Sequence, residues 1–359
     1  MIQILYIILI MKRVTYISHF AKTLTKEEIN QIGEISVRNN QRDGLTGVLF
    51  TYKNIFYQII EGPEDKLDAR LEKILQDPRH RDIYILKVEK NIPERKYSNW
   101  AMNTVILEEA QEYLIEPISE MLDAITQGAI IFEKYIPEHV IKSLRLGNNP
   151  LEETVKQVEK VIVFGDLFCS STFGEKLKEE TFYNLLESFF TISIDKIHES
   201  GGEVLRLMGD GFMAIFDSNQ VSSAVESIRN ISTQLKKLRE SYDSKSPFSL
   251  VFAGFGMSKG KVLQGNLGSK YKKDYTVIGD PVNTAARLQS VSRKIQHTLV
   301  FDENVAKELP KNNLKYIGRY APKGKLTKVP LYTLKDKEMQ IELSYNEIYE
   351  RIKALETNK

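Results

Sequence analysis

The chain has very few of the residues that build several common kinds of site. Its 359 residues include one cysteine, Cys169, which excludes an intramolecular disulfide and a zinc site made of several cysteines. The five histidines are scattered, without metal-ligand spacing. Fifty basic against 48 acidic residues give a net charge of +2, so no large field of one sign draws the protein to nucleic acid or to an anionic membrane. These features predict a reduced, cytoplasmic setting with no nucleic-acid partner.

Long hydrophobic runs are scarce as well. Residues 1–10 are almost wholly apolar, but they are too short to span a bilayer and lack the features of a secretory signal. We interpret them as an upstream extension before a more natural start at Met11; a tail that touches a membrane is the alternative. No integral membrane segment is therefore predicted. The length, with 42% apolar residues, predicts two domains with substantial cores.

Two carboxylates in the second half of the chain follow apolar runs. The runs on either side of Gly209-Asp210-Gly211 predict a β-hairpin over 205–216 with Asp210 at its tip. A further apolar run from residue 161 ends at Asp166. Two aspartates at the ends of neighbouring strands would make the oxygen-rich site that Mg²⁺ prefers. For either residue alone, a turn or a helix cap is the alternative.

A third segment carries an amide and a guanidinium. Asp280 is a good N-cap and Pro281 a good first residue for a helix that follows a short strand at 276–278. Asn283 and Arg287 lie four apart and so share one face of this helix. Apolar neighbours suffice to bury the helix, so this polar pair is free to bind a sugar oxygen and a phosphate.

In this order, the three segments resemble the class III nucleotidyl cyclase family over about 161–334. The resemblance implies that Asp166 and Asp210 hold two Mg²⁺ (or Mn²⁺) ions. It implies that Asn283 positions the ribose of the nucleotide and that Arg287 stabilises charge on the α-phosphate. It also implies a homodimer in which one chain supplies the aspartates and the other supplies the remaining contacts.

Some positions depart from the family or leave its pattern open. Gly165 stands where the family has Ser or Thr before the first metal aspartate. Arg206 lies four residues before Asp210, where adenylyl cyclases have Lys and guanylyl cyclases have Glu, and its partner position is Thr276. Because arginine only donates hydrogen bonds and Thr276 accepts from an amino group, we expect adenine to be preferred. Lys323 is a candidate contact to the triphosphate, with a solvated turn as the alternative.

The first hundred residues alternate strands and helices. A Thr-x-x-Glu capping box at Thr25 predicts one helix to about residue 40, and Pro63 predicts the start of a second. Strands are predicted at 14–18, 48–52, 55–60, 83–88 and 101–107. The order β-α-β-β-α-β-β implies a ferredoxin-like sandwich with an extra strand. The predicted fold class is α+β, with a ferredoxin-like domain at each end and a helical coiled-coil linker between them.

Several polar and aromatic residues in this half are badly placed for a plain core, because Tyr16 and Gln58 lie inside strands. As a set they resemble the BLUF family of blue-light sensors over about 12–107, through Tyr16, Ser18, Asn40, Gln58, Arg79, His80, Trp100 and Met102. The resemblance implies a bound flavin, FMN or FAD. It implies that Tyr16 and Gln58 contact the isoalloxazine ring and that Asn40 bonds its carbonyl.

The same resemblance implies roles for the remaining residues. Arg79 and His80 are expected near the ribityl-phosphate end, and Trp100 and Met102 are expected to report the state of the ring to the last strand. Light is expected to rearrange the hydrogen bonds around Gln58 without a covalent bond to the flavin.

Residues 108–150 lack the composition of a flexible linker. Apolar positions alternate at steps of four and three, namely Leu114, Ile118, Met121, Ile125, Gly128, Phe132 and Tyr135. This spacing predicts a short coiled coil and a parallel dimer, with packing of an amphipathic helix on its own domain as the alternative. Pro137 predicts the start of a further helix at 138–146.

Single helices are also predicted over 175–199 and over the apolar positions from 221 to 238. A strand at 250–257 is expected to continue into an extended arm, 259–268, at the dimer interface. The predicted organisation is an extension at 1–10, a BLUF photosensor at 11–107, a dimerisation linker at 108–150, a cyclase domain at 151–335 and a tail at 336–359, helical or partly disordered.

The predicted function is a blue-light-activated adenylyl cyclase that converts ATP to 3′,5′-cyclic AMP and pyrophosphate by two-metal catalysis. Two alternatives stay open. The enzyme acts on GTP, or the chain is a flavin photosensor whose cyclase-like domain only binds nucleotide or dimerises.

Overall fold

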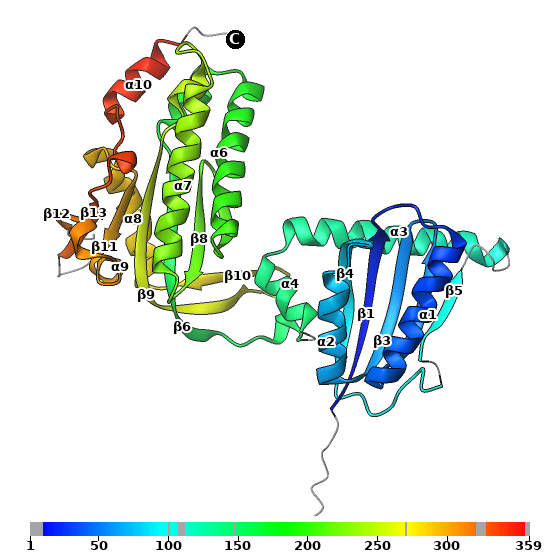
Figure 1. The fold of residues 1–359 in the computed structure, drawn as a ribbon. Helices are drawn as coiled ribbons and strands as arrows, with labels where there is room; N and C mark the ends of the chain where they lie inside the picture. Colours follow the sequence, from blue (N-terminus) through cyan, green and yellow to red (C-terminus); the bar gives the residue numbers. More distant parts are fainter. Residues whose placement is uncertain are drawn as a thin grey trace, which may run out of the picture. The chain divides into compact units, whose positions relative to one another are not determined.

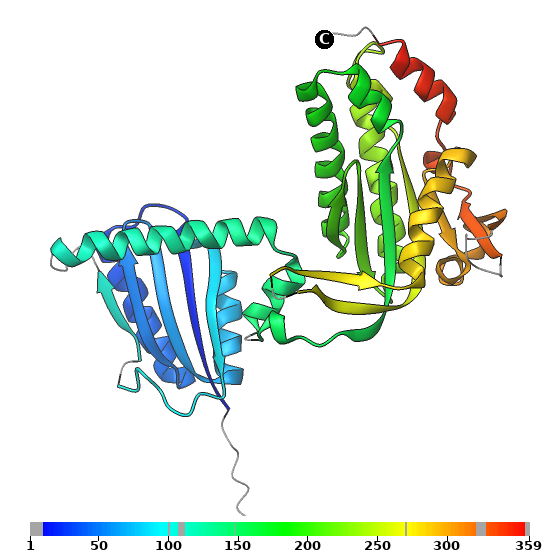
Figure 2. The same cartoon turned by 180° about the vertical axis from the view of Figure 1, so that it is seen from behind.

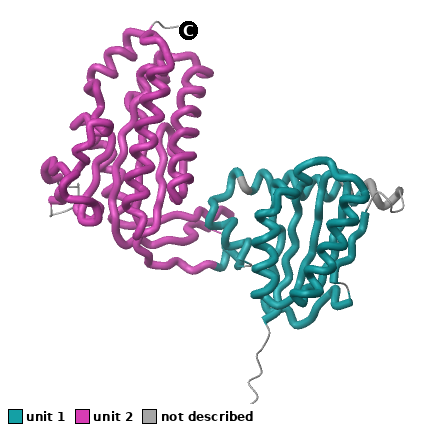
Figure 3. The backbone as a smooth tube through the Cα atoms, viewed as in Figure 1, with its two compact units in different colours: residues 1–152 teal, residues 153–359 magenta. Residues whose placement is uncertain are grey.

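The computed structural model describes residues 10–99, 101–106, 112–146, 148–269, 271–320 and 328–355. Trp100, Lys323 and the extension at 1–9 lie outside these ranges. The chain divides into two compact units, Met1–Glu152 and Glu153–Lys359 (Figure 3). No helix in the described ranges is both long and apolar enough to cross a bilayer.

The first unit is built on a five-stranded sheet in the order β4-β1-β3-β2-β5. Its strands are β1 (Met11–Phe20), β2 (Thr46–Tyr52), β3 (Ile55–Pro63), β4 (His80–Lys90) and β5 (Asn103–Ile106). Strand β1 is antiparallel to both β3 and β4, and β2 is parallel to β5. The predicted order of elements is confirmed.

Two helices cover one face of this sheet and a third packs on the other. Helix α1 (Lys26–Asp43) begins at the predicted capping box, and α2 (Glu64–Leu75) begins after Pro63. Alternate residues of β1 divide between the faces: Tyr16 packs with the buried side of α2, whereas Ile17 packs with Leu122 of α3 (Glu112–Tyr135). This period of two is the ordinary geometry of a strand buried on both faces. Figures 1 and 2 show α3 on the side of the sheet away from α1 and α2.

Helix α3 has apolar residues on two sides. Leu122 is 4% exposed and, with partly buried Ile118, packs on the sheet of its own unit. Ile118 therefore packs within its own domain, which was the alternative to a coiled-coil position. Other positions of the predicted seam remain uncovered: Met121 is 55%, Phe132 61% and Tyr135 85% exposed. Helix α4 (Glu138–Arg145) follows Pro137 as predicted.

The second unit is built on an eight-stranded sheet with the order β12-β13-β11-β9-β6-β8-β7, and β10 pairs with β9. Its strands are β6 (Lys156–Leu167), β7 (Glu203–Met208), β8 (Gly211–Asp217), β9 (Ala253–Gly268), β10 (Lys273–Ile278), β11 (Leu299–Asp302), β12 (Leu314–Tyr320) and β13 (Val329–Leu334). The predicted hairpin is β7–β8, and Gly209 in its turn has φ 63°, a conformation that glycine adopts without steric cost.

Helices lie on both faces of this second sheet. One face packs on α6 (Glu179–Glu199) and α7 (Val221–Glu240), and the other packs on α8 (Asp280–Ile295), as Figures 1 and 2 show. Val161 and Val163 face α6 and α7, whereas Ile162 between them faces α8. The three short helices are α5 (Ser170–Lys176), α9 (Glu303–Ala306) and α10 (Tyr345–Lys353).

Two of the predicted helix boundaries are wrong in detail. The single helix expected over 175–199 is two helices, because Leu177 is extended and its side chain packs against the core between α5 and α6. Asp280 was expected to cap α8, but extended Gly279 occupies the N-cap position and Asp280 is the first helical residue.

The segment after residue 335 packs into the second unit. Met339, Ile348 and Ile352 are fully buried and belong to its largest core. Strand β9 runs on past the body of the sheet to Gly268 and pairs with β10, which forms the expected arm. Its place at a dimer interface stays a prediction.

Candidate functional sites: a polar pocket and a pair of aspartates

A pocket in the first unit gathers residues from β1, α1, β3 and α2. Five of the residues expected to contact flavin line it, namely Tyr16, Asn40, Gln58, Arg79 and His80. Ser18 and Met102 each contact one of these five. Residues that are far apart in the sequence meet here because β1 and β3 are paired with Tyr16 opposite Gln58.

The inner end of the pocket is a chain of three hydrogen-bonded side chains. The Tyr16 hydroxyl donates to Gln58 Oε1, and Gln58 Nε2 donates to Met102 Sδ at 3.5 Å. The three residues are only 1%, 6% and 7% exposed. Burial raises the pKa of Tyr16 well above its usual value, so the phenol keeps its proton. The amide of Gln58 therefore has a fixed donor on one side and a weak acceptor on the other.

A second set of polar contacts surrounds this chain. Ser18 Oγ lies 2.8 Å from His80 Nδ1, and Asn40 Nδ2 donates to the Ala101 carbonyl at 2.7 Å. Burial lowers the pKa of His80 to about 4, so its imidazole is neutral at physiological pH. Asn40 thereby ties the end of α1 to the segment that leads into β5.

The pocket also has a charged side that the sequence analysis missed. Arg70 and Lys73 of α2 line it beside Arg79, whose Nε donates to Asp77 at 2.9 Å. Arg70 pairs with Asp43, but its buried Nε has no partner among the described residues. The spacing of Arg70 and Lys73, three apart on one helix face, was the available signal. This lining fits a flavin: the amide at one end suits the polar edge of the ring, and the cations at the other end suit the phosphate.

The second unit places Asp166 at the end of β6, beside the β7–β8 turn that holds Asp210, and their role in holding metal stays a prediction. Strands β6 and β8 pair with Asp166 opposite Gly211, and the Leu167 N–H donates to the Asp210 carbonyl at 3.3 Å. Within the described residues, no group of three or more His, Cys, Asp or Glu could hold a metal ion. Two carboxylates fit Mg²⁺, which completes its shell with phosphate oxygens and water.

Both aspartates already have partners that the sequence analysis did not identify. Ser170 Oγ donates to Asp210 Oδ2. Asp166 Oδ2 accepts from Gln289 Nε2 at 3.1 Å and is ion-paired with Arg293. Gln289 and Arg293 are four apart on α8, which packs beside β6.

The structure explains the glycine before Asp166. A Cβ atom on Gly165 would lie 2.6 Å from the ring of Phe212 and 2.8 Å from that of Phe255. The two rings occupy the space that the usual Ser or Thr of the family would need.

Asn283 and Arg287 do not join the aspartates of their own chain. They precede Gln289 and Arg293 by six residues on α8, which corresponds to a rotation of about 240° and a rise of about 9 Å. The residues that face Asp166 and the pair expected to bind substrate therefore lie on different sides of one helix.

The expected purine contacts lie close together. Arg206 is ion-paired with Asp274 of β10, with side chains that are 42% and 45% exposed. Thr276 is two residues further along β10, so its side chain lies on the same face as that of Asp274. Asp274 was missed, although strand alternation beside Thr276 pointed to it.

Comparisons with known proteins find a known family in each half of the chain. The BLUF family, described as sensors of blue-light using FAD, matches residues 11–103. The adenylate and guanylate cyclase catalytic domain family matches residues 153–336, which is just over half of the chain. Photoactivated adenylate cyclase subunit beta of Euglena longa is 27% identical over 343 residues, 95% of this chain and 39% of that protein. Subunit alpha of Euglena gracilis is 27% identical over 296 residues, 82% of this chain and 29% of that protein. The chain thus spans less than half the length of these curated relatives.

A solved structure matches along nearly the whole chain. A bacterial light-regulated adenylyl cyclase is 38% identical, with a TM-score of 0.89, and the match covers 97% of this chain and 100% of that one. A second structure of a bacterial light-regulated adenylyl cyclase is 37% identical, with a TM-score of 0.87 and coverage of 96% and 99%. The α+β class and the two-domain order are confirmed. The chain belongs to the family of light-regulated adenylyl cyclases in which a BLUF domain precedes an adenylate and guanylate cyclase catalytic domain.

Proposed function

We propose that the chain is a blue-light-activated adenylyl cyclase that converts ATP to 3′,5′-cyclic AMP and pyrophosphate. The observation that carries the proposal is that one chain holds both halves of such a device. The Tyr16–Gln58–Met102 hydrogen-bond chain lines a pocket in one unit, and Asp166 and Asp210 meet at paired strand ends in the other.

In the reaction, the 3′-hydroxyl of ATP attacks the α-phosphate and pyrophosphate leaves. Asp166 and Asp210 would hold two Mg²⁺ ions, which would lower the pKa of the attacking hydroxyl and neutralise charge on the leaving group. The residues of the chain mainly position the substrate and screen its charge. Asn283 orients the ribose and Arg287 stabilises the charge that develops on the α-phosphate.

The active form in this proposal is a parallel homodimer in a cytoplasmic setting. The exposed apolar side of α3 supports it, as do the exposed Leu263, Leu267 and Ile278 of the β9–β10 arm. Asn283 and Arg287 lie on a different side of α8 from the contacts to Asp166, which supports the proposal that they serve the aspartates of a second chain.

Mixing chains tests the shared site directly. An Asp210→Asn chain and an Arg287→Ala chain should each be inactive alone, and their heterodimer should regain one intact site. If heterodimers form without any recovery of activity, each site is built within a single chain.

Light sensing in the proposal rests on the buried hydrogen-bond chain. A flavin, FMN or FAD, held in the pocket supplies blue-light absorption and an excited-state oxidant. Tyr16, which lines the pocket, can supply an electron and a proton. Gln58 accepts a hydrogen bond from Tyr16 and donates one to Met102. When Tyr16 loses its proton it can no longer donate, so the Gln58 amide must exchange its donor and acceptor sides. Met102 lies next to β5, so the change reaches the last strand of the sheet.

The test is production of cyclic AMP and cyclic GMP by the full chain, with ATP or GTP, in the dark and in blue light. Light-dependent cyclic AMP is expected. Light-dependent cyclic GMP instead would make the chain a guanylyl cyclase, and nucleotide binding without product would make the second unit a non-catalytic module.

Two variants separate the functions. Asp210→Asn should lower turnover by orders of magnitude and keep the light-induced absorbance shift. Tyr16→Phe should keep flavin bound and lose both the shift and the activation by light. A normal shift in Tyr16→Phe would remove that residue from its role.

A further inference from the structure

A basic pocket of about 720 Å³ lies in the second unit, away from both sites described above. It is formed by the α5–α6 junction, the segment after α7 and the end of α10. Four cationic side chains line it: Lys176, Lys178, Lys245 and Arg351. Figure 1 shows α10 ending next to the end of α7, close to the C-terminus.

The positive charges of this pocket are only weakly balanced by the protein. No acidic residue lines it, and none of its four cations is in an ion pair with a described carboxylate. Glu347, which precedes Arg351 by one helical turn, has its pKa lowered mainly by its capping hydrogen bonds with Ser344 and in smaller part by the charge of Arg351. Four like charges around one hollow, with no carboxylate among the lining residues, form a surface complementary to an anion.

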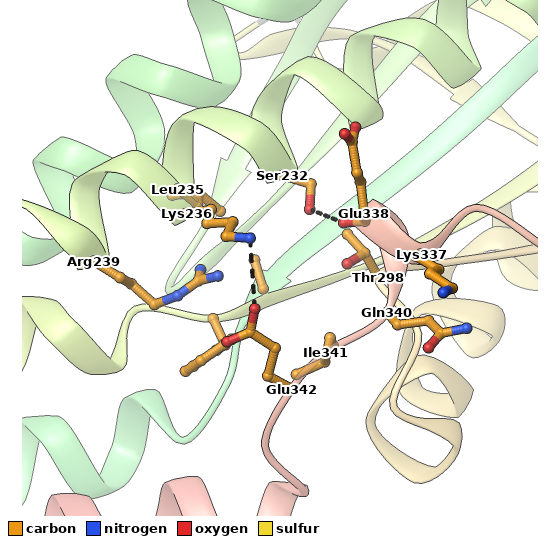
Figure 4. A pocket seen from close by; sticks show the side chains of 12 residues that line it. Ser232, Leu235, Lys236, Arg239, Thr298, Lys337, Glu338, Gln340, Ile341 and Glu342 are labelled. Carbon is orange, nitrogen blue, oxygen red and sulfur yellow. Dashed lines mark hydrogen bonds and ion pairs between the residues drawn. The ribbon is translucent and has the colours of Figure 1, made fainter.

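A second pocket of the same unit provides a contrast (Figure 4). There, Lys236 is 3.6 Å from Glu342, and Arg239 donates to the Val251 carbonyl at 3.0 Å and lies over the ring of Phe252. The two cations on α7 have partners within the protein. This second pocket is therefore not a candidate site for an anionic ligand.

The ligand must combine charge with some apolar surface. Besides the cations, the basic pocket is lined by Leu177, Pro247, Leu250 and Leu355, and the hydroxyl residues Thr181 and Ser244 complete its wall. We propose that it binds a small soluble ligand with several phosphate charges, and that binding regulates the cyclase.

The regulatory part follows from the two short helices that border the pocket. Helix α5 begins at Ser170, which donates to Asp210, and ends at Lys176 in the pocket. Helix α10 begins at Tyr345, whose ring lies 5.9 Å from the Arg293 guanidinium that pairs with Asp166. Each helix therefore links the pocket to a partner of one metal aspartate. A ligand that bridges Lys176 and Arg351 fixes the two helices relative to each other.

The binding test uses the full chain and inorganic tripolyphosphate in EDTA, by isothermal titration calorimetry. Lys245→Gln/Arg351→Gln should bind at least about tenfold more weakly than wild type, because it loses two charged donors. Lys311→Gln, an exposed lysine elsewhere in the same unit, is the matched control. Arg287→Ala should bind as wild type does, because the pocket is not the catalytic site.

Amide hydrogen exchange tests the link to catalysis. Tripolyphosphate should slow exchange in 170–176 and 345–353 in wild type and in Arg287→Ala, but not in the double variant. The proposal is overturned if wild type does not bind, if the double variant binds equally well, or if Arg287→Ala abolishes binding. Binding without slower exchange in either helix would overturn the regulatory link. The measurement needs no cyclase activity, so its outcome is independent of the proposed reaction.

Discussion

Arg206→Glu is expected to erode the preference for ATP only when Asp274 is neutralised as well. The two side chains form an ion pair in the structure. The single substitution would place a second carboxylate beside Asp274 and introduce repulsion that has nothing to do with the base. Arg206→Glu/Asp274→Asn removes that repulsion and leaves an acceptor for the N1–H of guanine.

The size of the effect follows from hydrogen-bond accounting. Guanine N1–H facing the Arg206 guanidinium is a donor without an acceptor, which costs about 1–3 kcal/mol, or roughly ten- to hundredfold in kcat/KM. The ion pair itself is 42% and 45% exposed, so it contributes less than about 1 kcal/mol to folding. Asp274→Asn should therefore shift the Tm by no more than about 4 °C.

The assay is kcat/KM for ATP and for GTP in blue light. Wild type should favour ATP by at least about tenfold on the penalty above. Arg206→Lys, the matched control, should preserve that ratio, and the double variant should reduce it. Equal production of cyclic AMP and cyclic GMP by wild type, or an unchanged ratio in the double variant, would show that Arg206 does not read the base.

Three further predictions concern packing, metal binding and pH. Gly165→Ser should cost about 1–3 kcal/mol and lower the Tm, because its Cβ would lie 2.6 Å from an aromatic ring. In the control, Gly174→Ser, an added Cβ would meet only an ordinary contact at 3.5 Å, and an equal loss in both variants would refute the packing argument. Arg293→Met should tighten Mn²⁺ binding in the absence of nucleotide, because it removes a cation that competes for Asp166; weaker binding by calorimetry would refute that competition. His80 has a folded pKa of about 4 against 6.5 for the exposed group, so the unfolded state takes up the proton first and stability should fall as pH drops from 6.5 towards 4. His80→Gln should flatten that part of the pH profile in urea unfolding, and an unchanged profile would assign the loss to other groups.

The features that were predicted correctly from the sequence depend on residues that are near neighbours in the chain. The capping box at Thr25, the start of α2 after Pro63 and the turn at Gly209 are all set within three or four residues. Hydrophobic period placed the strands, and two aspartates at strand ends implied a shared site before any contact was known. Tyr16 and Gln58 were found in the same way, as polar residues inside apolar strands.

Contacts that depend on the rotation of one element against another were not predictable. Arg293 and Gln289 reach Asp166 across 127 and 123 residues, and nothing near any of the three indicates it. The break at Leu177 and the burial of Met339 likewise follow from packing against a core assembled elsewhere.

The sequence by itself determined the order of elements, the two families it resembles and most of the residues in each site. Tertiary structure alone decided which side chains hold the two aspartates, why residue 165 has no side chain, and that four cations from three segments surround one pocket. The physical reason is the distance along the sequence over which each interaction acts. Helix caps, turns and periodicity are local, whereas packing, ion pairing and pockets depend on sheet register and helix rotation, which the whole fold sets at once.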